Sequence, residues 1–419
     1  MKTIRLAIFN EPYWDKGLIY TQNILPLKKM VELSQDKLEV ISFTSLPVLI
    51  LEWKKIKIAK KEFAKQGIKV KDYPILFYPT RFMALFYFLL PWYFMNIFLY
   101  IKYLSYVDKY KTIIYNMRSY QVSLGFLMFY KNKNNLVFDL RTDYIEENIN
   151  RGLFKAEGIT TNYWRRVEKE MLCVFRKSLF ISQQFRTTVL QRNCLIEDEE
   201  KYPIVYNPID YSHFQSIKRD EISENFLYTG SLGHWNNITN YLDFFLVIST
   251  YFPKSNLIIC TASPVYKVEP ILKECKYDSI RSRVVVKYNV PYHKLPKYYA
   301  KCKYGLQIMD KPDTRVGVKF IEYVAAGILP IVHENVKGAA HLVERFGLGL
   351  VFNNHDLIKP SLLADKIYST AGLDMNSDNY INFREHTDLN LIANKLLKIY
   401  DYKEDMCYIG KLPELPVEH

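Results

Sequence analysis

The sequence predicts an α/β protein with two Rossmann-like domains, and three observations lead to that fold class. The chain has 419 residues, which is more than one compact core usually holds. Short apolar strands alternate with helical segments along most of it, as in a parallel, doubly wound sheet. The alternation pauses at residues 203–210, where two prolines flank a short strand, and then starts again. We therefore predict a first domain over residues 1–205 and a second over 206–390.

The elements of the first domain follow from its apolar runs. Four runs are short enough for buried strands, and the segments after the first two have helical periodicity. We expect strands at residues 3–9, 38–44, 111–116 and 135–140, and helices near 20–33 and 52–66.

The second domain repeats the alternation. Apolar strands are expected within residues 224–230, 255–260, 282–290, 304–309 and 328–332, and helices at 237–252, 295–302 and 318–327. Gly327 stands where a helix C-cap belongs, directly before the last strand. Residues 391–419 begin with an amphipathic pattern, which we expect to form a helix that packs back on the first domain.

Residues 82–101 depart from the soluble pattern, because these 20 residues carry no charge and are long enough to span a bilayer. However, Pro91 and Asn96 interrupt the run, which also lies between strands of one sheet. A transmembrane helix and a buried core helix are the alternatives. We expect a pair of helices in the membrane interface, with flanking lysines directed toward anionic head groups.

Composition narrows the classes of partner and compartment. Hydrophobic residues make up 49% of the chain and charged residues 24%, which is a globular composition. The net charge of +13 implies an anionic partner, but no basic helix or aromatic platform points to nucleic acid. The 6 cysteines are scattered without metal-site spacing, which is typical of a reducing compartment. The first residues form a strand pattern rather than a signal peptide, so we expect a cytoplasmic protein.

Several motifs resemble those of GT-B glycosyltransferases, most closely the family 4 type of bacterial polysaccharide assembly. VKFIEYVAAGILPIV, from Val318, is similar to that family's K-x-x-E-Y-x-x-x-G-x-P-x-I signature. FLYTGSLGHW, from Phe226, resembles the strand and glycine loop that open the donor domain, and VYNPID, from Val205, resembles the hinge element. FDLRTDYIEE, from Phe138, and MRSY, from Met117, resemble two elements of the acceptor domain.

The resemblance implies two domains that face each other across a cleft, and a hexosyl- or N-acetylhexosaminyltransferase active there. Its donor would be a nucleoside-diphosphate sugar, used as a substrate without any further cofactor, and its acceptor a lipid-linked glycan. The resemblance also suggests that the anomeric configuration is retained. Such an enzyme would be cytoplasmic and peripheral on the inner face of the cell membrane, with the anionic membrane surface as a partner.

The residues from Gly317 to Glu322 offer the chemistry that a diphosphate leaving group needs. Gly317 permits close approach, and the N–H groups of Val318 and its neighbours at a helix start can meet phosphate oxygens. Lys319 adds a positive charge against the charge that develops on the leaving group, so we take it as catalytic as well as donor-binding. Glu322 lies three residues later on the same helix face, where its carboxylate can accept both ribose hydroxyls. The alternative is a solvated Lys–Glu pair.

Two glycine loops and one arginine complete the predicted donor site. Gly230, Ser231 and Gly233 form a turn after a strand, where backbone N–H groups can bind phosphate. Gly17, after the first strand, resembles the family's glycine loop facing the donor phosphates. Arg315 is either a further phosphate ligand or a surface arginine. Thr314 stands where many family members carry a first glutamate, which is a departure from the pattern.

The acceptor side is predicted from the carboxyl ends of first-domain strands. Asp139 is a candidate general base toward an acceptor hydroxyl, with a loop-capping aspartate as the alternative. Arg118 and Arg141 can bind acceptor phosphates through bidentate contacts, and Arg141 is also taken as catalytic. Glu146 lies in the paired-glutamate part of the acceptor motif and is expected to contact the acceptor.

Two other functions fit parts of the sequence. A nucleotide-sugar 2-epimerase shares the architecture, although the apolar run at residues 82–101 argues against it. A non-catalytic glycan- or lipid-binding partner of another transferase fits the loss of glutamate at Thr314. No DxD pair or histidine cluster is evident, so we expect transfer without a metal.

Overall fold

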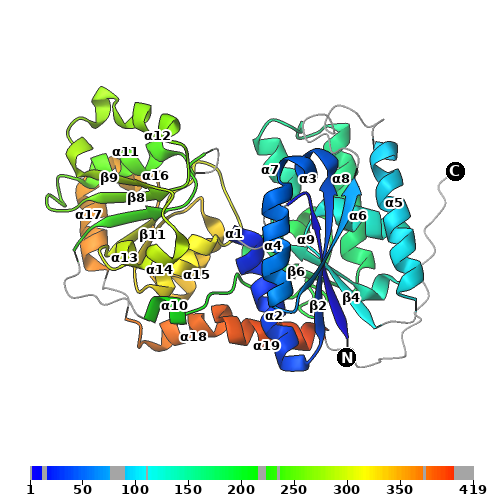
Figure 1. Ribbon diagram of the computed structural model, residues 1–419. Coiled ribbons are helices and arrows are strands. Elements are labelled where there is room, and N and C mark those ends of the chain that lie inside the picture. Colours follow the sequence, from blue (N-terminus) through cyan, green and yellow to red (C-terminus); the bar gives the residue numbers. More distant parts are fainter. Residues whose placement is uncertain are drawn as a thin grey trace.

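The protein has two α/β domains, each built on a six-stranded parallel sheet, as the sequence predicts. The computed structural model describes residues 2–11, 17–75, 90–109, 112–215, 223–233, 236–370 and 374–400. Figure 1 shows the two domains side by side, with α18 and α19 running along one side of the molecule from the second domain to the first.

The first sheet has the strand order β3-β2-β1-β4-β5-β6. Its strands form at the short apolar runs: β1 Thr3–Phe9, β2 Lys37–Ser45, β3 Lys69–Ile75, β4 Ile113–Met117, β5 Leu136–Leu140 and β6 Lys177–Phe180. Its helices are α1 Gly17–Ile19, the π-helix η1 Tyr20–Ile24, α2 Leu25–Ser34, α3 Leu46–Leu51, α4 Trp53–Lys65, α5 Leu90–Val107, α6 Tyr120–Phe129, α7 Tyr144–Asn150, α8 Ile159–Val174 and α9 Gln183–Arg192.

The second sheet has the order β12-β11-β10-β7-β8-β9. Its strands are β7 Phe226–Thr229, β8 Leu257–Thr261, β9 Val284–Tyr288, β10 Tyr304–Gln307, β11 Leu329–His333 and β12 Leu350–Phe352. Its helices are α10 Ser212–Gln215, α11 Ile238–Ile248, α12 Val265–Leu272, α13 Pro296–Tyr299, α14 Val318–Ala325, α15 Lys337–Phe346, α16 Asn354–Ile358, α17 Pro360–Ser369, α18 Asp378–Thr387 and α19 Leu389–Tyr400.

In each sheet the strand order reverses once, between β1 and β4 in the first and between β7 and β10 in the second. Ligands of open α/β sheets bind outside the carboxyl ends of the strands at such a reversal. The loops after these four strands are therefore where a site is expected.

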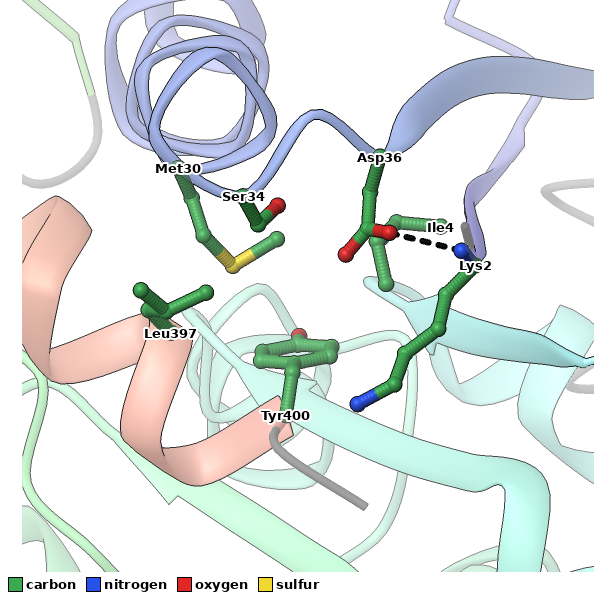
Figure 2. Close-up of a pocket in the computed structure, with 7 residues that line it drawn as sticks. All are labelled: Lys2, Ile4, Met30, Ser34, Asp36, Leu397 and Tyr400. Atoms are coloured by element: carbon green, nitrogen blue, oxygen red, sulfur yellow. Dashed lines mark hydrogen bonds between the residues drawn. The ribbon is translucent and has the colours of Figure 1, made fainter.

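The last helix, α19, packs against α2 of the first domain and completes one of its hydrophobic cores with Ile392, Leu396 and Ile399. Tyr400, at its end, accepts a hydrogen bond of 2.5 Å from Asn116 Nδ2 on β4. Figure 2 shows a cavity of about 310 Å³ beside Tyr400, between α2, α19 and the start of β1. This cavity lies at the amino end of β1, away from the carboxyl ends where the strand order reverses.

Residues 82–89 of the apolar run lie outside the described residues, and the side chains of the run are described from Met95 onward. The described part is α5, which begins at Leu90 with Pro91 in its first turn, a position that proline tolerates. Ile97 and Ile101 are fully buried against α6, where the glycine at position 125 makes room: a Cβ there would come within 2.5 Å of Ile97.

The outer face of α5 is apolar and open to solvent. Met95, Leu99, Tyr103 and Tyr106 recur at helical spacing and are 51%, 58%, 57% and 81% exposed. No helix among the described residues is long and apolar enough to cross a membrane.

Candidate functional site

Glu322 lies at the centre of the second-domain half of the site. It is 2% exposed, and its Oε2 accepts hydrogen bonds from Lys319 Nζ at 2.7 Å and from Tyr299 Oη at 2.8 Å. Tyr299, on α13, also lies 3.4 Å from the Thr229 hydroxyl at the end of β7. The predicted Lys–Glu pair is therefore part of a cluster that joins α14 to β7, in which Glu322 is buried and the Lys319 side chain is 32% exposed.

Tyr299 is a member of this cluster that the sequence reasoning missed. Burial and the nearby Glu322 carboxylate raise the pKa of its hydroxyl, so it stays a protonated donor to Glu322. Tyr323 contributes next to it, because its hydroxyl accepts from the Thr229 backbone N–H at 2.9 Å. The two tyrosines fix the glutamate and the end of β7 relative to each other.

The start of α14 is open at its backbone donors. Gly317 is the N-cap and provides no side-chain cap, so the first N–H groups of the helix, beginning at Val318, are available to a ligand. Gly317 has a φ of −69°, and a Cβ there would meet only Gln307 Nε2, at an ordinary 3.6 Å. Neither backbone conformation nor protein packing therefore demands glycine here, and the space beside Gly317 is open to the close approach that the sequence predicts.

The loop after β7 is a turn that contains Gly230, Ser231 and Gly233, and its first glycine has a left-handed conformation. Gly230 has a φ of 148°, which a residue with a side chain rarely adopts. Two side chains hold the loop. Tyr228 Oη donates to the Ser231 carbonyl at 2.9 Å, and Ser263 Oγ accepts from Leu232 N at 2.7 Å. The Gly233 N–H donates a backbone hydrogen bond that closes the turn. The two residues after Gly233 lie outside the described residues.

Arg315 is placed differently from the phosphate ligand that was predicted. Its Nε and Nη2 donate to the two oxygens of Asp313 at 2.8 and 2.9 Å. Its Nη1 donates across the domain boundary to Thr142 Oγ1 at 3.2 Å and to Glu147 Oε1. The guanidinium is therefore engaged by two carboxylates rather than directed toward the start of α14. Thr314, next to it, accepts from Ser182 Oγ of the first domain through its carbonyl at 2.6 Å.

On the first-domain side, Asp139 is 2% exposed and fully engaged. Its Oδ1 accepts from Arg141 Nε at 2.7 Å, and its Oδ2 from Asn23 Nδ2 at 2.7 Å and Asn116 Nδ2 at 3.3 Å. Both oxygens of this carboxylate are engaged and shielded from solvent, which favours the structural alternative over a general base.

Arg141 is 6% exposed and points back into the protein. Besides Asp139, its guanidinium donates to the Val205 carbonyl at 3.4 Å and to Asn207 Oδ1 at 3.2 Å. Asn207 in turn donates to the carbonyl of Val316 at 2.8 Å, directly before Gly317. Arg141 thus connects the two domains instead of presenting its donors to the cleft.

Arg118, after β4, is the predicted acceptor residue that lies at the strand reversal. Its Nη1 donates to Gln22 Oε1 at 3.0 Å and to Asn23 Oδ1, both in the π-helix η1. A π-helix is rare and is often found at functional sites. Glu11, after β1, lies 3.8 Å from Arg118 Nε. Burial raises the pKa of the Glu11 carboxyl, and the charge of Arg118 opposes that rise.

The remaining predicted residues lie at the edge of this side. Glu146 pairs with Arg165 at 3.0 Å, and both side chains are about 40% exposed. Gly17 has a φ of 70° and begins α1, but residues 12–16 of its loop lie outside the described residues. Glu11, Gln22 and Asn23 were not predicted, although Glu11 directly follows the first strand, as candidate residues in such folds do.

A metal site is not evident in the described ranges. Between residues 2 and 400, leaving out the segments that are not described, no three His, Cys, Asp or Glu side chains are grouped so that they could hold an ion.

Solved structures with the same two-domain arrangement are similar to this chain over almost its whole length. The Anabaena protein Alr3699/HepE, solved with UDP and glucose, has a TM-score of 0.64 at 13% identity, over 95% of this chain and 99% of that one. A glycosyltransferase from Rickettsia africae has a TM-score of 0.62 at 14% identity, over 95% and 97%. WaaG, a glycosyltransferase involved in lipopolysaccharide biosynthesis, has 0.61 at 11%, over 95% and 99%. These likenesses establish the GT-B fold for the chain.

No family model matches the sequence, and no curated protein matches it.

Proposed function

We propose that this protein is a glycosyltransferase that moves a hexosyl or N-acetylhexosaminyl unit from a nucleoside-diphosphate sugar to a glycan acceptor. The observation that carries the proposal is the Glu322–Lys319–Tyr299 cluster beside the uncapped start of α14. In a GT-B fold this position lies at the strand reversal of the second sheet. The Anabaena neighbour, solved with UDP-glucose, supports a donor of this class.

In the proposed reaction the bond between the anomeric carbon and the diphosphate oxygen breaks, and its electron pair stays on the diphosphate. Lys319 and the first N–H groups of α14 stabilise that developing charge, while Glu322 holds the ribose. The acceptor hydroxyl forms the new bond and loses its proton. Because both oxygens of Asp139 are engaged, we propose that an oxygen of the departing diphosphate takes the proton, with retention of configuration and without a divalent metal.

The acceptor is proposed to be a lipid-linked glycan presented at an anionic membrane. The exposed apolar face of α5, formed by Met95, Leu99, Tyr103 and Tyr106, supports this part, because such contiguous faces mark interaction surfaces. Lys102 lies on the same exposed side of the helix, where head-group phosphates would meet it. The protein would then be peripheral on the cytoplasmic face, in surface-polysaccharide assembly.

The test is release of nucleoside diphosphate from a panel of UDP-, GDP-, ADP- and dTDP-sugars, with and without extracted lipid-linked glycans. The proposal expects release from one donor that depends on an acceptor, and a glycosylated product by mass spectrometry. A 2-epimerase would change the donor sugar without an acceptor, which NMR detects. Binding without release or conversion would indicate a non-catalytic partner.

A further inference from the structure

Several contacts between the domains fall on one short segment of the second domain, residues 311–316, which leads from β10 to α14. From the first domain, Ser182 contacts the Thr314 carbonyl, Thr142 and Glu147 contact Arg315, and the Asn150 carbonyl accepts from Lys311 at 3.5 Å. Asn207, between the domains, holds the Val316 carbonyl. We call residues 311–316 the donor loop, because they end at the start of α14.

The Arg315 side chain joins the donor loop to the first domain. Asp313 binds it in bidentate fashion within the loop, and Glu147 binds its remaining terminal nitrogen from α7. All three side chains are largely buried, at 14–19% exposure. A bidentate arginine in such surroundings is geometrically fixed, unlike an exposed ion pair.

The first-domain half is held by contacts within its own domain. α7 is capped by Asp143, which is bound at 2.7 Å by Arg192. Arg192 is held by Glu168 at 2.8 Å, and Glu168 has no exposed surface. Glu147, on the first turn of α7, is oriented further by Thr142 Oγ1 at 2.5 Å. Its carboxylate is therefore a fixed point to which the donor loop is tied.

The loop itself lacks secondary structure, but it is packed closely on its other side. A Cβ at Gly338 would collide with the carbonyls of Thr314 and Arg315. The start of α15 therefore contacts the loop backbone directly. Ordering a free loop costs conformational entropy. Contacts that already hold the loop remove part of that cost from ligand binding.

We propose that Glu147 is a positioning residue for the donor site: through Arg315 it fixes the donor loop, so that the acceptor domain sets the geometry of the donor-binding start of α14. The part of the inference that concerns donor binding rests on the proposed function. The part that concerns the ordering of the donor loop does not. In this role Glu147 does not contact a substrate and acts only through Arg315.

Glu147→Gln distinguishes this role from a simple charge effect. The substitution removes one negative charge near a site for an anionic diphosphate, so electrostatics alone predicts tighter donor binding. The positioning role predicts the opposite, a Kd about tenfold higher, which corresponds to about 1.4 kcal/mol. The matched control is Glu62→Gln on α4, which removes the carboxylate from an exposed pair with Lys65 far from the cleft.

The experiment measures the UDP-sugar or other donor Kd by calorimetry and amide hydrogen exchange of the free protein, for wild type, Glu147→Gln, Arg315→Gln and the double variant. We expect faster exchange at residues 313–317 in all three variants, unchanged exchange within α7, and a double variant that binds donor no more weakly than Arg315→Gln alone. Unchanged exchange in the donor loop or tighter donor binding by Glu147→Gln would overturn the inference. So would a double variant whose loss of donor affinity is the product of the two single losses. If wild type binds no nucleotide sugar, the proposed function fails, while the exchange measurement still decides the role of Glu147.

Discussion

Arg141 in the first domain and Val316 in the second are joined through a single side chain, that of Asn207. Its Oδ1 accepts from Arg141 Nη1 at 3.2 Å, and its Nδ2 donates to the Val316 carbonyl at 2.8 Å. Asn207 is 1% exposed, so losing either bond would leave a polar group unsatisfied.

This link unites motifs that are far apart in the sequence. Arg141 is bound to Asp139, Asp139 to Asn23, and Asn23 to Arg118. The acceptor-domain motifs, the hinge and the start of the donor helix therefore form one continuous network. Several of these residues hold the two domains together, and we propose that Glu322 and Lys319 are the ones that contact the donor.

The first prediction concerns Glu322 and Lys319. Glu322→Ala is expected to weaken nucleotide-sugar binding by about 1.5–3 kcal/mol, since a charge-assisted hydrogen bond to the ribose is lost. Lys319→Ala should also weaken binding and should lower kcat further, because the lysine opposes charge that grows in the transition state. Calorimetry and steady-state kinetics measure both. Glu344→Ala on α15, an exposed carboxylate, serves as the control. Unchanged donor affinity in both variants would end the assignment.

The second prediction separates the two roles of Asp139. Asp139→Asn keeps the shape and one accepting oxygen, whereas a general base would lose its function entirely. We expect Asp139→Asn to retain activity within about tenfold and to lose about 1–3 kcal/mol of unfolding free energy, because the buried Arg141 loses its counter-charge. Urea unfolding and turnover are measured on the same preparation. A loss of more than about a thousandfold in kcat with little change in stability would restore the catalytic role.

The sequence was sufficient for the fold class, for physical reasons that particular residues illustrate. Strands such as β1 and β4 are buried and mostly apolar, so their short apolar runs located them. β3 is an edge strand with exposed Lys69, and β6 has only four residues, so neither gave a strong signal. Lys319 and Glu322 were found because helical spacing is local.

Pairings between distant segments could not be predicted in the same way. Tyr299 meets Glu322 only because α13 packs beside α14, and Arg315 meets Glu147, 168 positions away, only once both domains are folded. The arginines at positions 118 and 141 were correctly located at strand ends. Sequence cannot tell whether such a side chain points into the cleft or back into the protein.

The third prediction uses the pH dependence of Glu11. Burial raises the pKa of this carboxyl above its ordinary value of 4.5, so it becomes protonated at a higher pH than a free glutamate. Protonation leaves the charge of Arg118 uncompensated, and an anionic acceptor should then bind more tightly. We expect the Kd for a short isoprenyl-diphosphate sugar to fall as the pH is lowered through the window just above 4.5, and Glu11→Gln to bind tightly throughout.

The same shift has a consequence for stability. A carboxyl with a raised folded pKa contributes stability that is present below its unfolded pKa and is lost as the pH rises through the folded value. Glu11→Gln should therefore be at least as stable as wild type at neutral pH in urea unfolding. A neutral alkyl glycoside is the control ligand, for which no such pH dependence is expected. Equal pH profiles for wild type and Glu11→Gln would exclude Glu11 as the titrating group.

The fourth prediction is that turnover is independent of divalent metal. Lys319 and the open N–H groups of α14 supply positive charge that a metal would otherwise supply at the diphosphate. Activity should survive dialysis against excess EDTA, with unchanged kcat. Complete loss that manganese or magnesium restores would show that a metal is required, and zinc serves as a control for nonspecific recovery.

The last prediction concerns the outer face of α5. Leu99, Tyr103 and Tyr106 are more than half exposed, and covering apolar area is favourable by about 25 cal/mol per Å². We expect the protein to sediment with phosphatidylglycerol vesicles and less with phosphatidylcholine vesicles, because lysines near this face add attraction to anionic head groups. High salt should release it only in part, since burial of aromatic side chains is not screened.

Replacing Leu99, Tyr103 and Tyr106 by serine should release the protein from anionic vesicles while donor binding, measured by calorimetry, persists. The inner face of α5, with Ile97 and Ile101 in the core, is untouched by these changes, so the fold should be retained. The matched control replaces Ile196, Val265 and Tyr266, which are exposed elsewhere to 89%, 52% and 72%. If the control variant is released equally, the attraction is a general property of the surface. If wild type stays in the supernatant, α5 is covered by something other than lipid, and the acceptor need not be membrane-bound.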